Sequence, residues 1–284
     1  MLDIYICTFI GATVFFAQPD ALKSSLSETL VEVKPTIFFS VPRIWEKFQE
    51  NIEKHVKKQS QLKQSIFKWA INVGNLYTMS KFNGSIHKTF SFWLANLLVL
   101  HKIRKLMGFS NCKLFLSGAA PISFETLTFF AGIGVPLCEV FGMSESTGPH
   151  ILGHAECNSV GSVGFVKNKF NKTKILSPDE NMIGEIAMFG RHIFMGYLNQ
   201  EESTRETIDA DGYLLSGDLG KIENNGFLRV TGRIKELIIT AGGENISSIP
   251  IEDRIKNELS FISNCMLIGD NQKFLTVLLT LKVK

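Results

Sequence analysis

A short polar segment that follows an apolar run combines residue types able to hold phosphate groups and a cation. The run from 133 to 140 predicts a strand, and it leads into Phe141-Gly142-Met143-Ser144-Glu145-Ser146. Hydroxyls and backbone N–H groups in a turn after a strand can bind phosphate oxygens, and a carboxylate can bind the accompanying divalent cation. The ring of Phe141 could stack on a base. An ordinary strand–loop connection explains the same residues. The rest of the chain must therefore distinguish a phosphate-binding turn from a simple connection.

Three further segments place polar side chains beside glycines or at the end of a strand. The two oxygens of Asp218, in Ser216-Gly217-Asp218-Leu219-Gly220, could accept both hydroxyls of a ribose, although such an Asp also forms a simple Asx-turn. Arg233 and Lys235 are two positions apart, so an extended chain would point both to one side, toward a polyanion or toward solvent. The pair Gly242-Gly243 makes a turn or lets an extended ligand pass close to the backbone.

The elements expected around these segments predict an α/β fold of mixed sheets and helices. A strand at 112–117 ends in the small-residue turn 118–121, and Ser123 caps a helix that leads back to the strand at 133–140. This βαβ-like unit favours parallel pairing with helices on the faces of the sheet. Upstream we expect a strand at 36–39, a helix from Pro42 onward, and helices at about 62–79 and 90–107.

Beyond His150 the sequence changes to short strands separated by turn residues. Asn224-Asn225-Gly226 is a hairpin signal, and the region predicts an antiparallel, β-rich part of the protein. A helix at 250–259 and strands at 266–268 and 275–281 follow. The apolar run at 4–17 is shorter than the ~20 residues of a membrane-spanning helix, and we expect it to be buried as strands or a helix.

Composition limits the classes of function. The chain has 284 residues, 45% of them hydrophobic, and a net charge of +3, which gives no reason to expect a nucleic-acid partner. Five cysteines without any C-x-x-C pair indicate a reduced, cytosol-facing compartment and no zinc site. The helix from Pro42 carries Ile44, Phe48, Ile52 and Val56 on one stripe and basic residues mainly off it, as on a solvated surface helix or one that rests on an anionic membrane.

The sequence lacks one familiar phosphate-binding pattern and nearly matches one nucleophile pattern. The phosphate-binding pattern G-x-x-x-x-G-K-[ST] is absent. The segment Gly142-Met143-Ser144-Glu145-Ser146 differs from the G-x-S-x-G nucleophile motif only in its last residue. A hydrolase with Ser144 as nucleophile and His150 or His192 as base therefore remains an alternative.

Taken in order, the motifs resemble those of the adenylate-forming enzymes, which include acyl-CoA synthetases, luciferases and adenylation domains of peptide synthetases. Within that superfamily the chain is most similar to the bubblegum long-chain acyl-CoA synthetases, notably at 148–150, 190–198, 238–245 and 277–282, and the resemblance covers essentially the whole chain. The motifs that carry it are Gly118-Ala119-Ala120-Pro121, Phe141-Gly142-Met143-Ser144-Glu145-Ser146, Gly184-Glu185-Ile186, Met195-Gly196-Tyr197, Ser216-Gly217-Asp218-Leu219-Gly220 and Gly232-Arg233-Ile234-Lys235-Glu236.

The resemblance implies a long-chain fatty acid–CoA ligase with ATP and CoA as co-substrates and Mg²⁺ as cofactor. In such a ligase, the resemblance implies that Ser144 contacts phosphate and that Glu145 holds Mg²⁺. It also implies that Asp218 binds the ribose hydroxyls and that Arg233 assists Asp218. Lys235 falls at the hinge of a small C-terminal domain, and Gly242 and Gly243 border the CoA tunnel. The ATP- or AMP-binding positions that it implies are Gly118, Ala119, Glu139, Phe141, Gly142, Met143, Ser144, Glu145, Ser146, Asp218 and Arg233.

The chain also departs from the family pattern. The family's lysine-ended Ser/Thr/Gly-rich phosphate loop does not precede this region, and the lysine of the C-terminal domain does not follow it. We therefore expect a fragment with 1–233 as part of the AMP-binding domain, 151–233 as its β-rich part, and 234–284 as hinge and truncated C-terminal domain. Such a fragment would have weak or no ligase activity; the alternative is a non-catalytic regulatory protein derived from a synthetase. The resemblance implies a cytoplasmic location, peripheral on the endoplasmic reticulum or other cytosol-facing membranes, and leaves the preferred acyl chain length undefined.

Overall fold

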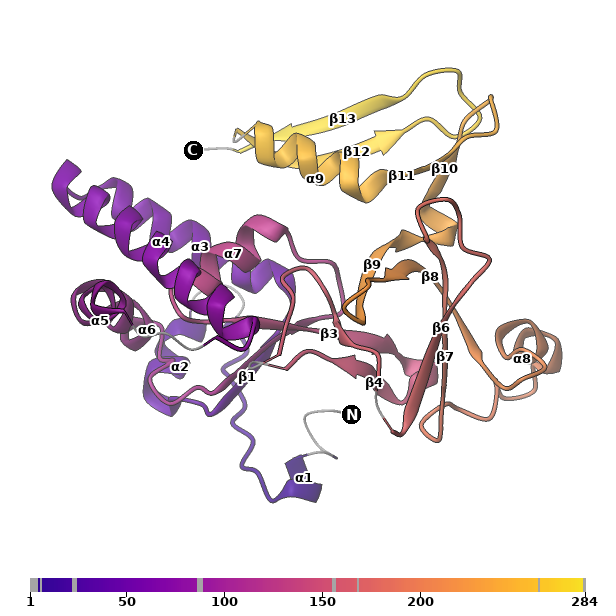
Figure 1. Cartoon of the computed structure of the whole chain (residues 1–284), viewed down its shortest axis with the longest axis horizontal. Helices are drawn as coiled ribbons and strands as arrows, with labels where there is room; N and C mark the ends of the chain where they lie inside the picture. The colour runs from indigo at the N-terminus through magenta and orange to yellow at the C-terminus, as the bar shows by residue number, and fades with distance from the viewer. Residues whose placement is uncertain are drawn as a thin grey trace. The chain divides into compact units, whose positions relative to one another are not determined.

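The protein folds as two compact units (Figure 1). Unit 1 comprises Met1–Gly142 and Ile151–Gly164, and unit 2 comprises Met143–His150 and Phe165–Lys284. The computed structural model describes residue 5 and residues 7–21, 25–85, 89–154, 157–167, 169–259 and 261–282. Mixed α/β architecture, with several sheets, is as the sequence predicts.

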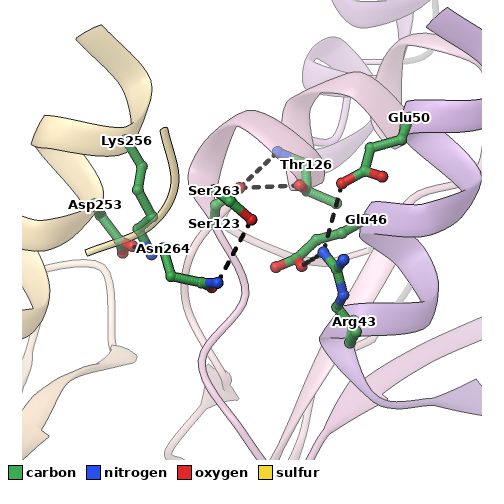
Figure 2. A network of polar contacts seen from close by, with 9 residues as sticks. All are labelled: Arg43, Glu46, Glu50, Ser123, Thr126, Asp253, Lys256, Ser263 and Asn264. Carbon is green, nitrogen blue, oxygen red and sulfur yellow. Dashed lines mark hydrogen bonds and ion pairs between the residues drawn. The ribbon is translucent and has the colours of Figure 1, made fainter. Parts of the chain in front are cut away.

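A four-stranded sheet with the order β1-β2-β3-β4 positions the first group of candidate residues. Strand β1 (Ile37–Ser40) pairs in parallel with β2 (Leu114–Gly118), and β2 pairs in parallel with β3 (Leu137–Met143); β4 spans Gly148–Leu152. Helix α7 (Phe124–Gly132) connects β2 to β3, which confirms the βαβ unit. Ser123 caps α7, since its hydroxyl accepts the Thr126 N–H at 3.1 Å (Figure 2).

Helices α3, α4 and α7 of unit 1 pack against one another (Figure 1). The helical elements are α2 (Leu26–Val33), α3 (Pro42–Lys57), α4 (Gln61–Phe82), α5 (Phe90–Ala95), a π-helix (Asn96–Leu100) and α6 (His101–Leu106). The predicted apolar stripe of α3 faces the core through Ile44 and Phe48, beside the fully buried Trp45. Trp45 packs edge-on against Phe130 of α7, with ring centroids 5.1 Å apart. On the outer face of α3, Arg43 pairs with Glu46 at 3.1 Å (Figure 2).

The N-terminal apolar run is not buried, so that prediction is wrong for the residues that the structure describes. The run forms a single helical turn, α1 (Cys7–Ile10), followed by residues without regular secondary structure, and Phe9 is 91% exposed and Phe16 82% exposed. A one-turn helix joins no sheet and offers too little surface to pack these side chains against a partner. Hydrophobicity alone therefore did not predict burial here.

Unit 2 contains a five-stranded sheet with the order β5-β9-β8-β7-β6. Its pairs β6–β7, β7–β8 and β8–β9 are antiparallel, as expected, and the predicted hairpin at Asn225 and Gly226 joins β8 to β9. Ile186, Met188, Leu214 and Leu228 are fully buried in it. The bounds are β5 (Gly164–Phe165), β6 (Asn171–Leu176), β7 (Gly184–Gly190), α8 (Glu201–Thr207), β8 (Leu214–Ile222) and β9 (Phe227–Arg233).

The last part of unit 2 begins with a 3₁₀ turn at Ile234–Glu236. Strand β10 (Leu237–Ile239) pairs with β11 (Asn245–Ser247), α9 spans Ser248–Glu258, and β12 (Ile262–Ile268) pairs antiparallel with β13 (Thr276–Leu281). Helix α9 lies against β12 and carries a partly exposed ion pair of Lys256 and Asp253 (Figures 1 and 2). Within the described ranges, no helix is both long and apolar enough to cross a bilayer.

Candidate functional site

The ends of β2 and β3 hold the candidate residues of unit 1. A Cβ on Gly118 would lie 3.2 Å from the ring of Phe39 and 3.3 Å from Cβ of Val140, so this close approach of strands favours glycine. Ala119 follows in the left-handed region at φ 71° and is exposed. The backbone at Gly118 and Ala119 therefore presents a sharp, small-residue turn at the end of the strand, as a slot for a flat ring requires.

Strand β3 places Glu139 and Phe141 two positions apart, on the same side of the strand. Glu139 is half-buried, and its carbonyl accepts the N–H of Gly153 at 3.0 Å. Phe141 is only 8% exposed. A base stacked on this ring would therefore meet only the small part of it that remains open, while Gly142 beyond it is exposed.

In unit 2 the residues after β3 form a fixed turn. Ser146 is buried, and its hydroxyl accepts the N–H of Met143 at 3.0 Å and donates to the carbonyl of Gly148 at 2.7 Å. Ser144 is exposed on the same 3₁₀ turn, Ser144–Ser146. The structure thus uses the Ser146 hydroxyl to build the turn and leaves the Ser144 hydroxyl facing outward, where it could contact a phosphate.

A distant segment supports the Glu145 carboxylate. The hydroxyl of Tyr197 donates to Oε1 of Glu145 at 2.7 Å, and the N–H of Phe194 donates to the Glu145 carbonyl at 2.8 Å. The hydrogen bond to Glu145 raises the pKa of Tyr197, because it favours the protonated phenol. Sequence patterns gave Tyr197 no role beyond membership of a motif, since 52 positions separate it from Glu145.

The donor set suits a magnesium ion that is bound mainly by phosphates. In the described part of the chain no three His, Cys, Asp or Glu side chains cluster as metal ligands. Magnesium commonly takes one or two carboxylates and completes its shell with waters and substrate phosphates. The half-buried, hydrogen-bonded carboxylate of Glu145 fits that pattern.

The imidazoles of His150 and His192 stack on each other, with ring centroids 5.0 Å apart. His150 Nδ1 is 2.9 Å from His192 Nε2, and His150 Nε2 is 2.9 Å from the hydroxyl of Thr173. Burial, followed by the neighbouring His192, lowers the pKa of His150 to about 4, and burial also lowers the pKa of His192. Both ring nitrogens of His150 are engaged, so neither is free to act as a base for Ser144.

The predicted ribose site brings Asp218 and Arg233 together. Nε of Arg233 donates to Oδ1 of Asp218 at 3.0 Å, across the pair of strands β8 and β9. Burial raises the pKa of Asp218, and the Arg233 charge opposes that shift. Asp218 lies within β8 and pairs with a side chain, so the Asx-turn alternative is wrong. Two acceptor oxygens of a mostly buried carboxylate remain suited to a diol.

Lys235 and the glycine pair occupy turns. Lys235 is exposed within the 3₁₀ turn after β9, so the prediction that an extended chain points Arg233 and Lys235 to one side is wrong. Gly243 closes a turn between β10 and β11, with φ 81° and its N–H donated to the Thr240 carbonyl at 2.9 Å. The turn alternative for this segment is thereby confirmed. Roles in a hinge and a CoA tunnel stay predictions.

These features are those of an AMP-binding enzyme. The family model with that description matches residues 1–198, and the chain belongs to this family. Among individual proteins it is 50% identical over 282 residues to the long-chain-fatty-acid–CoA ligase ACSBG2 of Xenopus laevis, covering 99% of this chain and 38% of that protein. The corresponding Homo sapiens protein is 45% identical over 282 residues, covering 99% of this chain and 42% of the human protein. The chain thus spans about two-fifths of the length of these relatives.

Solved structures show the same fold. The anthranilate CoA ligase AuaEII in complex with anthranoyl-AMP matches with a TM-score of 0.63 at 17% identity, covering 95% of this chain and 44% of that chain. The O-succinylbenzoate coenzyme A synthetase of Bacillus subtilis, in complex with ATP and magnesium ion, matches with a TM-score of 0.60 at 20% identity, covering 97% and 47%. At these identities the likeness concerns the fold alone.

Proposed function

We propose that the chain is part of a long-chain fatty acid–CoA ligase. The observation that carries this proposal is the Glu145 carboxylate, held by Tyr197 beside the exposed Ser144 on the turn after β3. That arrangement suits Mg²⁺ and phosphate, and the 50% identity to a long-chain-fatty-acid–CoA ligase supports the substrate class. ATP, CoA and a long-chain fatty acid are the substrates.

The reaction has two half-steps. A carboxylate oxygen of the fatty acid attacks the α-phosphorus of ATP, and the bond to pyrophosphate breaks. The sulfur of CoA then attacks the acyl carbonyl, the bond to AMP breaks, and the thiol proton passes to solvent. Both steps depend on alignment and on neutralisation of negative charge more than on a protein nucleophile.

The residues of the two units have separate roles in this proposal. Gly118, Ala119 and Phe141 accept the adenine, and the exposed Ser144 hydroxyl donates to a phosphate oxygen. Glu145 holds Mg²⁺, which supplies positive charge to the phosphates. Asp218 accepts the ribose hydroxyls, and Arg233 keeps its carboxylate ionised against the effect of burial. Glu139, Gly142, Met143 and Ser146 are the remaining nucleotide-binding positions of the proposal.

The domain assignment belongs to the same proposal. Residues 1–233 form part of the AMP-binding domain, with 151–233 as its β-rich part, and 234–284 contain the hinge at Lys235 and the start of a C-terminal domain. Gly242 and Gly243 border the path of CoA. The protein works in the cytoplasm, peripherally on cytosol-facing membranes such as the endoplasmic reticulum.

Nucleotide binding and turnover test the proposal separately. Calorimetric titration of the 284-residue chain with AMP should show binding, and Asp218→Asn should weaken it at least about tenfold, as expected when a charged acceptor is lost. Lack of AMP binding, or equal binding by the variant, would contradict the site. Incubation with radiolabelled palmitate, ATP, Mg²⁺ and CoA should give little palmitoyl-CoA, and rapid formation would contradict the expected weak activity of this chain.

A further inference from the structure

Residues 54–124 contain no carboxylate side chain, and this acid-free region includes the helices α4, α5 and α6. No Asp or Glu occurs between Glu53 and Glu125, although the whole chain has 27 of them. The net charge of the whole chain is only +3, so positive charge is concentrated in this region. A local cluster of charges of one sign attracts an oppositely charged surface even when the net charge of the whole protein is near zero. The basic residues in the acid-free region are Lys54, Lys57, Lys58, Lys63, Lys68, Lys81, Lys88, Lys102, Arg104, Lys105 and Lys113.

Most of these cations face solvent without a carboxylate partner. Lys57, Lys68, Lys102 and Lys105 are exposed, and the ion pairs found among the described residues include none from the acid-free region. Arg104 differs, because it donates to the Ile133 carbonyl at 2.7 Å and to Asn96 at 2.6 Å. The exposed charges are therefore not neutralised within this part of the protein and can act on an external anion.

Large apolar side chains share the exposed surface of α5, the π-helix and α6 with these cations. Phe90 is 75% exposed and stacks on Trp93, which is 56% exposed, with ring centroids 5.8 Å apart. Leu97 is exposed one turn further on, and Leu106 is 78% exposed at the end of α6. Tryptophan, phenylalanine and leucine beside lysine are typical of helices that lie in the interface of a bilayer. A nucleic acid would use the cations but would leave the leucines in water.

An apolar groove opens at the same surface. It has a volume of about 610 Å³ and lies between α3, α4 and α6. Its walls include the exposed Leu98, Lys102 and Leu106, so the groove continues from the exposed helical face. No carboxylate lines it, and its volume is in the range of ligand-binding pockets. The π-helix supplies part of the wall, and such helices occur frequently at functional sites.

We propose that α5, the π-helix and α6 are the docking surface for an anionic phospholipid membrane, with the groove receiving an acyl chain of one lipid. This inference rests on the peripheral membrane association proposed above and specifies the surface and the lipid charge. Phe90, Trp93 and Leu97 enter the interface, while Lys102 and Lys105 contact the headgroups. Each such cation contributes about 1 kcal/mol, equivalent to about a fivefold change in binding.

Vesicle flotation of the 284-residue chain tests the charge requirement. The chain should bind phosphatidylcholine vesicles that contain about 30 mol % phosphatidylserine and should not bind pure phosphatidylcholine. The double variant Lys102→Glu, Lys105→Glu should lose at least about tenfold in binding. Lys167→Glu, Lys169→Glu makes the same change of charge at exposed residues of unit 2 and should have a much smaller effect. Circular dichroism checks that each variant is folded.

Lipid-depth quenching tests which residue enters the bilayer. Vesicles with brominated acyl chains should quench the tryptophan emission of the bound chain. Trp93→Phe should remove most of that quenching, and Trp69→Phe on α4 should retain it. Neither flotation nor quenching depends on acyl-CoA formation, so the result is independent of ligase activity.

Several outcomes would overturn the inference. Lack of binding to any vesicle would refute the membrane association itself. Binding that both charge-reversal variants lose equally, or quenching that survives Trp93→Phe, would leave the association intact but refute this surface. Binding of transfer RNA without binding of vesicles would favour a nucleic acid, and a self-associated chain that Trp93→Ser converts to monomer would show that a second copy covers the surface.

Discussion

The hydroxyl of Tyr197 lies 2.7 Å from Oε1 of Glu145 and donates a hydrogen bond to it. Because Tyr197 precedes α8 and Glu145 lies on the turn after β3, this bond connects two distant parts of the sequence. A carboxylate on a turn has several rotamers, and a phenol bound to one oxygen selects one of them. The other oxygen then remains for a metal ion.

Replacement of Tyr197 by phenylalanine should therefore weaken magnesium-dependent nucleotide binding. We expect a loss of about three- to tenfold, the effect of one hydrogen bond to a charged group that is partly open to water. Titration of the chain with ATP over a range of Mg²⁺ concentrations measures it. Binding of AMP without Mg²⁺ should not change. Tyr213→Phe, which removes a hydroxyl from another tyrosine of unit 2, is the matched control, and an equal loss in both variants would contradict the role.

The Asp218–Arg233 pair leads to a prediction about which of two substitutions weakens AMP binding more. Asp218→Asn removes the acceptor charge, and Arg233→Ala removes only the group that counteracts the burial-induced rise in the pKa of Asp218. We expect AMP binding at pH 7 to fall more for Asp218→Asn than for Arg233→Ala. Because Asp218 is more easily protonated without Arg233, the loss in Arg233→Ala should grow as the pH is lowered from 7 to 5. A pH-independent loss would contradict this assignment.

Local sequence patterns predicted those helices and strands whose own residues show a regular apolar spacing or a capping side chain. The fourfold spacing of Ile44, Phe48 and Ile52 predicted α3, and the hydroxyl of Ser123 marked the start of α7. Strand β6 was not predicted, because Lys172 and Lys174 interrupt its apolar residues, and α8 has no apolar stripe. The contacts that define the site, such as Tyr197 with Glu145, join residues far apart in sequence, and no local pattern encodes them.

The stacked pair of His150 and His192 predicts that the protein is less stable in mild acid. The pKa of His150 is about 4 in the folded chain and about 6.5 when unfolded, so the unfolded state binds more protons between these values. The stabilising effect of the neutral imidazole is complete above pH 6.5 and is lost as the pH falls toward 4. We expect a decrease on the order of 1–3 kcal/mol in the free energy of unfolding.

Urea denaturation of the chain at several pH values between 7.5 and 4.5 measures this decrease. In His150→Gln the free energy of unfolding should be lower at pH 7.5 and should depend less on pH, because the titrating group is gone. His101→Gln removes an exposed imidazole of α6 and should keep the slope of the unchanged chain. An unaltered slope in His150→Gln would show that other groups cause the acid sensitivity.

Close packing of α4 on α7 depends on a glycine in each helix. A Cβ on Gly74 would collide with the backbone carbonyl of Gly132, and the backbone there cannot move away as a flexible side chain could. The nearby hydroxyl of Thr78 donates to the Ala131 carbonyl at 2.9 Å and fixes the separation of the helices. Gly74→Ala should therefore destabilise the protein by about 1–3 kcal/mol, although alanine favours a helix more than glycine does. Asn72→Ala, at an exposed position of α4, should be neutral or slightly stabilising in the same denaturation experiment, and a similar effect for Gly74→Ala would show that the helices can separate at little cost.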